Sequence, residues 1–168
     1  VFNGEVYNFK ELRRELGPSA GPYRGDSDTE VLLAAFEAWG PREAVTRFRG
    51  MFAFALYDTR ERELWLARDR MGIKPLYVAG DGSWLAFGSE LRSLLPHPRV
   101  ENRGSRTAAW HYLRTLYVPA PCSIIEGVRK VPPGSLLRFS VDGSGVVARE
   151  EGAFWSLEDV AAAGIRGP

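Results

Sequence analysis

The stretch that most restricts the fold of this chain is residues 51–57 (MFAFALY), which are apolar without a break. A strand with one face in water alternates apolar and polar side chains, so this run favours a β-strand that is covered on both faces. Shorter apolar runs follow at residues 64–67, 75–79 and 84–87, with turn-forming residues between them. Such a series of short strands predicts antiparallel pairing.

Helical periodicity precedes and follows these strands. Residues 9–16 (FKELRREL) carry apolar side chains at helical spacing. Ser27 and Glu30 fit a capping box at the start of a second helix, which the Gly-Pro pair at residues 40–41 is expected to stop. Further helices are expected over residues 42–48, 89–95 and 107–116, and further strands over residues 128–131, 135–141 and 146–149.

These elements predict an α+β fold. Two antiparallel strand groups, several helices and strands apolar on both faces favour a sandwich, in which two sheets pack together and helices cover their outer faces. The tail after Trp155 has only a weak pattern, so a linker is expected over residues 156–168. The chain begins with Val1 inside an apolar strand pattern, and we therefore expect its natural start to lie further upstream.

Charge and cysteine content argue against several classes of function. The net charge is +1, which gives no electrostatic case for binding nucleic acid or an anionic membrane. No apolar run approaches the length of a membrane span, and no signal peptide opens the chain. The single cysteine, Cys122, excludes an internal disulfide and a cysteine zinc cluster, and no metal site is expected. A lone cysteine suits a reducing compartment, so we expect a cytoplasmic protein.

The candidate chemistry lies at Asn3-Gly4-Glu5. Apolar residues precede it and a helical pattern starts at Asn8, which predicts a strand end, a glycine turn and a helix start. The side-chain amide of Asn3 and the unshielded backbone N–H of Gly4 are two donors suited to an oxyanion, and the Glu5 carboxylate suits an ammonium group. An ordinary Asn-Gly turn is the alternative interpretation.

Other polar residues give weaker signals. His97 and His111 lie in no nucleophile motif, and we expect structural or solvated roles for both. Neither a Walker A nor a G-x-G-x-x-G motif occurs. Asp28 is expected in the first turn of the second helix, where a carboxylate is favourable, and it is also able to bind an ammonium group. Cys122 is interpreted as a small buried hydrophobe.

Six segments that occur in a characteristic order support a functional role for these residues. They are VFNGEVYNFKELRREL, GDSDTEVLLAAFEAWG, RGMFAFALYD, ARDRMGIKPLY, FGSEL and VPAPCSIIEGVRKVPPGSLLRF. Together they resemble the glutaminase domain (class II glutamine amidotransferase) of the glutamine-hydrolysing asparagine synthetases. Each segment alone is weak evidence for the family, whereas all six in order are strong evidence. The resemblance implies the four-layer αββα N-terminal-nucleophile fold, with two antiparallel sheets between helical layers, incomplete at the N-terminus.

The resemblance also implies a mechanism and a site. In that family an N-terminal cysteine attacks the side-chain amide of L-glutamine, with its own α-amino group as the base. Asn3 and Gly4 match the residues that hold the oxyanion, and Glu5 and Asp28 match those that bind the substrate's α-ammonium. No cofactor is implied for this segment. Ammonia would pass to a synthetase domain that uses ATP and Mg²⁺ to amidate aspartate.

Two parts of that enzyme are not found in the sequence. The nucleophilic cysteine and a glutamine-binding arginine are expected before Val1, and the synthetase domain after the linker at residues 156–168. We therefore expect a partial glutaminase domain over residues 1–155 that is inactive alone. Cys122 cannot replace the nucleophile because an internal cysteine has no free α-amine. Met71 and Gly88 stand where the family usually has Phe and Ala, which we expect to affect packing only.

Three interpretations stay open at this point. The first is a piece of a glutamine-dependent asparagine synthetase, favoured by the presence of Asn3, Gly4, Glu5 and Asp28 together. The second is a non-catalytic, glutaminase-like module with a structural or interaction role. The third is the corresponding domain of a β-lactam-synthetase-like enzyme. The acceptor substrate, the pathway and the formation of a homodimer are left undecided.

Overall fold

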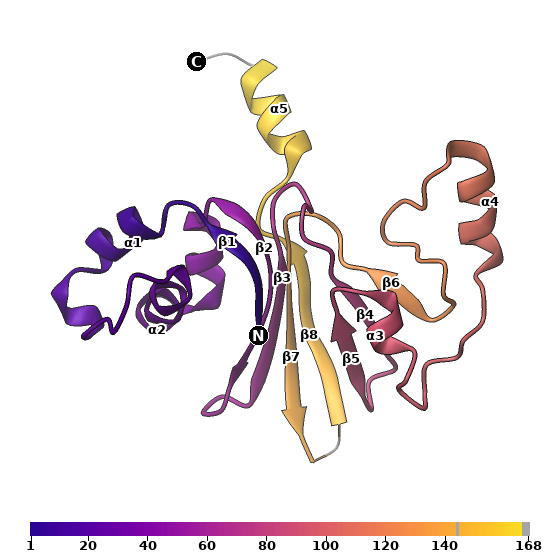
Figure 1. Cartoon of the computed structure of the whole chain (residues 1–168), viewed down its shortest axis with the longest axis horizontal. Coiled ribbons are helices and arrows are strands. Elements are labelled where there is room, and N and C mark those ends of the chain that lie inside the picture. Colours follow the sequence, from indigo (N-terminus) through magenta and orange to yellow (C-terminus); the bar gives the residue numbers. More distant parts are fainter. Residues whose placement is uncertain (144, 166–168) are drawn as a thin grey trace.

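The computed structural model describes residues 1–143 and 145–165 (Figure 1). Its strands are β1 (Phe2–Val6), β2 (Gly50–Asp58), β3 (Glu63–Arg68), β4 (Tyr77–Gly80), β5 (Leu85–Gly88), β6 (Val128–Lys130), β7 (Ser135–Asp142) and β8 (Gly145–Ala153). Its helices are α1 (Phe9–Leu16), α2 (Asp28–Arg47), α3 (Leu91–Leu94), α4 (Arg106–Thr115) and α5 (Leu157–Ile165), with a 3₁₀ turn, η1, at Pro18–Ala20.

The strands form two antiparallel sheets. The first sheet has the order β1-β2-β3-β7-β8, and the second has the order β5-β4-β6. Both the predicted pairing direction and the two-sheet sandwich are confirmed. The grouping along the chain differs from the prediction, because the meander over residues 51–87 is divided between the sheets. Its first two strands, β2 and β3, belong to the first sheet, where β3 pairs with β7. Its last two strands, β4 and β5, belong to the second sheet, where β4 pairs with β6.

Asp69 explains why the chain leaves the first sheet after β3. The Asp69 side chain is fully buried, and its carboxylate accepts backbone N–H bonds from Phe52, Met71, Ile73 and Lys74 at 2.9–3.2 Å. These four bonds fix a tight loop that redirects the chain toward the second sheet. Asp69 therefore organises the crossover between the two sheets.

The centre of the run at residues 51–57 is covered on both faces, as predicted, whereas Tyr57 at its end is 47% exposed. Phe52 and Phe54 lie on the side of β2 that packs against α1 and α2, where the largest core cluster includes Leu32 and Val45 of α2. Ala53 lies on the opposite face, in the core between the two sheets. This alternation is what strand geometry requires when both faces of a strand meet apolar layers.

The second sheet is also covered on two sides. Val78 of β4 faces the first sheet and packs with Leu66 and Leu137. Its neighbour Ala79 faces the other way and packs with Leu94 of α3. The order of layers is therefore helices α1 and α2, first sheet, second sheet and α3, as Figure 1 shows from left to right. The predicted αββα architecture is confirmed.

The helices near the N-terminus follow the sequence signals closely. The Ser27 hydroxyl caps α2 by accepting from the Thr29 backbone N–H at 3.2 Å. Glu30 does not complete the capping box, because its carboxylate accepts from the Gly25 N–H at 2.9 Å instead. Gly40 has a φ of 74° and interrupts the helical path at the predicted stop, so α2 consists of two helical pieces that meet at a kink.

Two later helices differ from expectation. The large apolar residues of α4 are exposed, with Trp110 at 53% and Leu113 at 81%, although Ala108 is buried. α4 lies at the far end of the molecule beyond β6 (Figure 1). The predicted linker over residues 156–168 contains the helix α5, which a weak apolar pattern did not reveal. Within the described residues, no helix is long and apolar enough to cross a membrane.

Candidate functional site at the edge of the first sheet

Asn3, Gly4 and Glu5 lie inside strand β1 and not in a turn, which corrects the sequence prediction. Asn3 is paired with Ala53 of β2, and Glu5 is paired with Met51. The turn follows at residues 7–8. The Asn8 side chain holds it there, donating to the Arg47 carbonyl at 3.0 Å and accepting from the Arg49 N–H at 2.8 Å.

Gly4 is a glycine because the two strands approach each other closely at this point. Its φ is +150°, and a Cβ there would lie 2.1 Å from the Met51 carbonyl oxygen. Gly50 on the neighbouring strand β2 is also at a close approach, since a Cβ there would lie 2.1 Å from the Glu5 carbonyl oxygen. The Asn-Gly dipeptide thus marks a close backbone approach, which is the other common use of glycine in a strand.

The backbone N–H of Gly4 points to the open edge of the first sheet, defined here as the side of β1 away from β2. In an antiparallel pair, opposed residues alternate between exchanging two hydrogen bonds and exchanging none. Val1 and Ala55 exchange both bonds at 2.8 and 2.9 Å. Gly4 and Phe52 are therefore a non-bonded pair, consistent with Phe52 using its N–H and C=O on Asp69.

Asp28 lies on that same open edge. Its carboxylate accepts from the backbone N–H of Val6 at 2.9 Å, and Val6 is the residue after Glu5. As the first residue of α2, Asp28 also sits at the positive end of the helix dipole. The structure therefore brings together all four residues of the predicted site.

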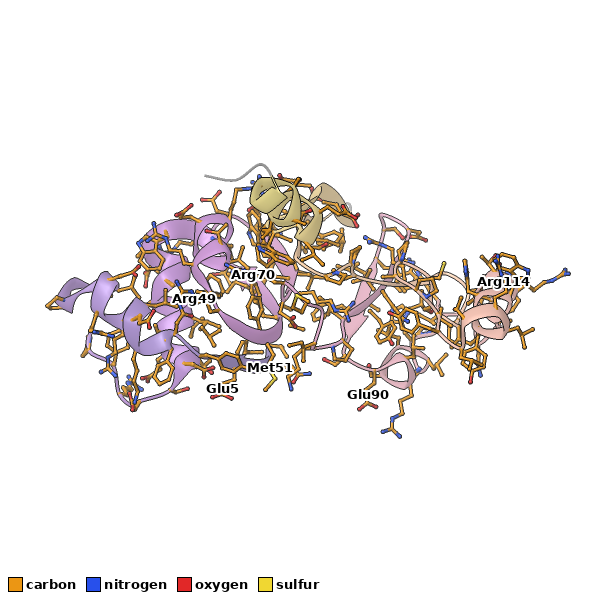
Figure 2. The ribbon with its side chains drawn as sticks, turned by 90° about the horizontal axis from the view of Figure 1, so that it is seen from above. Glu5, Arg49, Met51, Arg70, Glu90 and Arg114 are labelled. Atoms are coloured by element: carbon orange, nitrogen blue, oxygen red, sulfur yellow. The ribbon has the colours of Figure 1, made fainter. Side chains whose placement is uncertain are left out.

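The second sheet supplies a neighbour that the sequence analysis missed. The Asn3 side-chain amide donates to the hydroxyl of Ser89 at 3.0 Å, and Ser89 follows strand β5. Its segment FGSEL was recognised only as part of a resemblance and as a helix start. Met51 was also missed, and Figure 2 shows it beside Glu5, with Glu90 on the same side of the molecule.

The acidic groups of the site differ in how they are compensated. Glu90 forms an ion pair with Arg92 at 2.6 Å. Glu5 is exposed and makes no ion pair with any residue in the described part of the chain. The Glu5 carboxylate is thus available to a cation from solution. The edge of β1 combines hydrogen-bond donors for an anion with carboxylates for a cation, a few residues apart.

The model of the glutamine amidotransferase domain family matches residues 1–150 of this chain. The chain belongs to that family. The match covers every residue of the site at β1, the start of α2 and the end of β5.

Relatives of this amidotransferase domain have longer chains. It is 34% identical over 163 residues to asparagine synthetase (glutamine-hydrolyzing) 3 of Bacillus subtilis, covering 94% of this chain and 25% of that protein. It is 45% identical over 148 residues to a putative asparagine synthetase (glutamine-hydrolyzing) of Mycobacterium tuberculosis, covering 84% of this chain and 22% of that protein. The amidotransferase domain thus spans about a quarter of the length of the curated relatives it matches.

Solved structures support the fold. Glutamine phosphoribosylpyrophosphate amidotransferase from B. subtilis aligns with 92% of this chain and 28% of its own, with a TM-score of 0.59 and 19% identity. An allosteric regulatory enzyme of purine biosynthesis aligns with a TM-score of 0.55 and 21% identity. At this identity the likeness concerns the fold alone, which is that of the N-terminal-nucleophile amidotransferases.

Cys122 is remote from the site in this amidotransferase domain. It lies between α4 and β6, where the neighbouring Pro121 carbonyl accepts from the Lys130 N–H at 2.9 Å. β6 and β5 are the opposite edges of the second sheet, and Ser89 follows β5. Two strand spacings, roughly 9–10 Å, therefore separate β6, beside Cys122, from β5, which leads to Ser89.

Neither histidine takes part in the site. His97 stacks on Trp84 with ring centroids 4.5 Å apart, and its Nδ1 accepts from the Arg99 N–H at 3.3 Å. His111 lies on α4 with its ring 5.2 Å from that of Trp110. The structural roles predicted for both histidines agree with these contacts.

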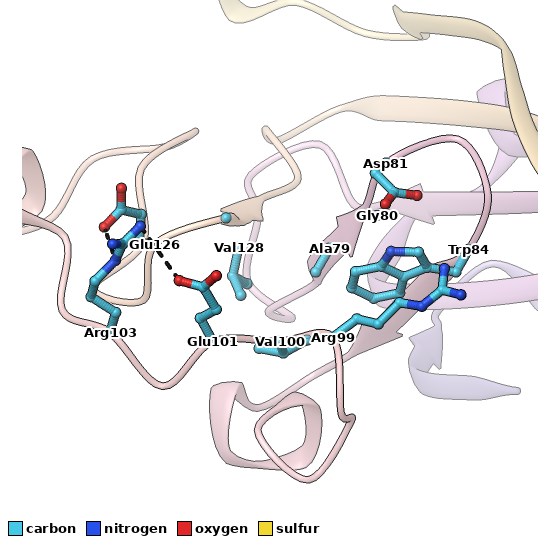
Figure 3. A pocket seen from close by; sticks show the side chains of 11 residues that line it. Ala79, Gly80, Asp81, Trp84, Arg99, Val100, Glu101, Arg103, Glu126 and Val128 are labelled. Carbon is cyan, nitrogen blue, oxygen red and sulfur yellow. Dashed lines mark ion pairs between the residues drawn. The ribbon is translucent and has the colours of Figure 1, made fainter.

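A cavity of about 390 Å³ lies elsewhere, on the outer face of the second sheet (Figure 3). Ala79 and Val128 form its floor, and Glu101 and Glu126 line its rim. Both carboxylates already pair with Arg103, at 3.4 and 2.7 Å. A paired carboxylate is less available to a cation than the Glu5 carboxylate, so the edge of β1 is better suited to bind an ammonium group than this cavity.

Proposed function

We propose that this chain is the glutaminase domain of a glutamine-dependent asparagine synthetase, which releases ammonia from L-glutamine for the amidation of aspartate. The observation that carries the proposal is the open edge of β1. There the Gly4 N–H points outward, the Asn3 amide lies beside it, and Glu5 and Asp28 follow within a few residues. Membership of the glutamine amidotransferase family and the similarity to named asparagine synthetases support it.

The residues have separate roles in the proposed hydrolysis. Attack on the glutamine amide carbon turns the carbonyl oxygen into an oxyanion, which two fixed N–H donors, Asn3 Nδ2 and Gly4 N, would stabilise. The substrate's α-ammonium carries its charge before and during the reaction. Glu5 and Asp28 would therefore contribute to binding of the ground state and the transition state alike. The chain's own residues thus bind glutamine and stabilise charge.

The proposal requires a nucleophile that Cys122 does not provide, so it requires a cysteine at the N-terminus of the mature natural protein. Sequencing that N-terminus tests this requirement. The proposal also assigns ATP and Mg²⁺ to a synthetase domain of the parent chain, and it places the protein in the cytoplasm. Sedimentation of the natural protein measures its oligomeric state and so tests whether it forms a homodimer.

The decisive assay uses the natural protein that contains this chain. Incubation with glutamine, aspartate, ATP and Mg²⁺ is expected to yield glutamate and asparagine. Formation of glutamate without asparagine would support the glutaminase activity and would contradict aspartate as the acceptor of the ammonia. Absence of glutamate would reject the enzyme and favour the non-catalytic module or the β-lactam-synthetase-like domain.

A further inference from the structure

One side-chain hydrogen bond joins the two sheets at the proposed oxyanion site. Asn3 Nδ2 donates to Ser89 Oγ at 3.0 Å, although the two residues are 86 positions apart in sequence. Asn3 belongs to the edge strand of the first sheet, and Ser89 follows the edge strand β5 of the second. The separation in sequence means that the packing of the two sheets creates this contact.

Ser89 is itself held in place by a tight connection to α3. The preceding residue, Gly88, pairs with Tyr77 of β4, and a Cβ on Gly88 would lie 2.4 Å from the Ser93 hydroxyl. Ser93 in turn donates its hydroxyl and its backbone N–H to the Glu90 carbonyl, at 2.6 and 3.1 Å. These contacts hold the backbone on both sides of Ser89, and the Ser89 hydroxyl accepts from Asn3 at the edge of the site.

An asparagine amide needs such an acceptor if it is to act as an oxyanion donor. The torsion that turns an Asn amide is broad, so an exposed Asn samples many orientations of its N–H groups. The NH₂ group has two N–H donors. With one of them bound to Ser89, the amide plane is restrained and the second N–H remains for the substrate oxygen.

We propose that Ser89 is a positioning residue for glutamine hydrolysis, which orients the Asn3 amide toward the developing oxyanion. This inference rests on the proposed glutaminase function. Preorganised donors stabilise charge that develops in the transition state, so Ser89 acts on kcat and leaves the KM for glutamine nearly unchanged.

The test compares variants of the natural protein in a glutamate-release assay. Ser89→Ala is expected to lower kcat about tenfold, because it removes one hydrogen bond that orients the Asn3 amide. The KM for glutamine is expected to change less than twofold. Ser89→Thr keeps the hydroxyl and is expected to retain most of the activity. Ser83→Ala is the matched control, because Ser83 is an exposed serine whose hydroxyl bonds Asp81 and Arg99 away from the site.

A double variant separates positioning from other roles. In an Asn3→Ala background, Ser89→Ala is expected to change kcat less than twofold, because the amide that it orients is gone. If Ser89→Ala does not fold, Ser89→Cys, which keeps the size and weakens the acceptor, is expected to show the same fall in kcat.

Each other outcome has a definite meaning. An inactive wild-type protein would overturn the proposed function and this inference together. An active wild type whose Ser89→Ala variant has an unchanged kcat, or a raised KM alone, would overturn the positioning role and leave the glutaminase intact. Independent, multiplicative losses in the double variant would also overturn it.

Discussion

The backbone N–H of Val6 donates to the Asp28 carboxylate at 2.9 Å, and this bond ties the start of α2 to the strand that carries the proposed site. Asp28 therefore combines two functions, since it satisfies a backbone donor on the open edge of β1 and places a negative charge one residue from Glu5. A pair of substitutions can separate the two.

Asp28→Asn keeps an oxygen for the Val6 N–H and loses the charge, whereas Asp28→Ala loses both. We expect Asp28→Asn to raise the KM for glutamine about tenfold with little change in kcat, because an ammonium is bound equally in ground and transition states. Glu5→Gln is expected to act in the same way. Steady-state kinetics of the natural protein measures both, with the exposed Asp26→Asn as control. A normal KM in both Asp28→Asn and Glu5→Gln would refute the ammonium assignment.

Gly4→Ala is expected to disturb the pairing of β1 and β2. A Cβ would lie 2.1 Å from the Met51 carbonyl oxygen and would require an unfavourable positive φ. The free energy of unfolding should fall by about 2–3 kcal/mol, as in other overpacked sites, and glutamine hydrolysis should be lost. Urea unfolding measures the change. The control is Gly143→Ala, where a Cβ meets no atom within 4 Å. Equal stability of the two variants would show that the close approach is not required.

Asp69→Ala is expected to destabilise the fold strongly. The substitution leaves four backbone N–H groups without their acceptor at a fully buried position. A buried donor without a partner costs about 1–3 kcal/mol, so a total loss of roughly 3–5 kcal/mol is expected after partial relaxation. Asp81→Ala is the matched control in an exposed turn, and we expect it to destabilise the fold much less than Asp69→Ala. Similar midpoints for both variants in urea would contradict the role given to Asp69.

A polypeptide limited to residues 1–168 is expected not to release ammonia from glutamine. Its one cysteine, Cys122, is internal and lies beside the far edge of the second sheet. An ammonia-release assay on that polypeptide checks this, and activity abolished by thiol alkylation would contradict it. In the natural protein, Cys122→Ser is expected to leave glutamine hydrolysis unchanged.

The doubly covered strand could be predicted from sequence because the pattern is local. Residues 51–56 contain no polar side chain, and Phe52 and Ala53 are buried in different cores as a result. The helix stop at Gly40 was equally local. In both cases the amino-acid types themselves restrict the backbone.

The errors arose where a residue's environment is set by distant parts of the chain. Asn3-Gly4 has the composition of a turn, and only the neighbouring Met51 carbonyl explains the glycine inside a strand. The partnership of Asn3 with Ser89 depends on how the sheets pack. The apolar spacing of α4 was correct, yet spacing alone does not show whether Leu113 meets another layer, and it is exposed.

The four site residues were nevertheless found from sequence, because a resemblance supplies the order of motifs that single residues lack. The physical reasoning then explains their types. Donors at Asn3 and Gly4 suit an oxyanion, and carboxylates at Glu5 and Asp28 suit an ammonium group. The place of Ser89 in the site was not predicted, because nothing in its local sequence distinguishes it from a helix-capping serine.

The kinetics of Asn3→Ala in the natural protein test the central claim most directly. Removal of one oxyanion donor is expected to lower kcat for glutamine hydrolysis by about 10²–10³-fold, with KM changed less than threefold. The matched control is Asn102→Ala, which replaces an exposed asparagine in the loop before α4 and should leave kcat unchanged. A normal kcat, or a change confined to KM, would contradict the assignment of β1 as the edge that stabilises the oxyanion.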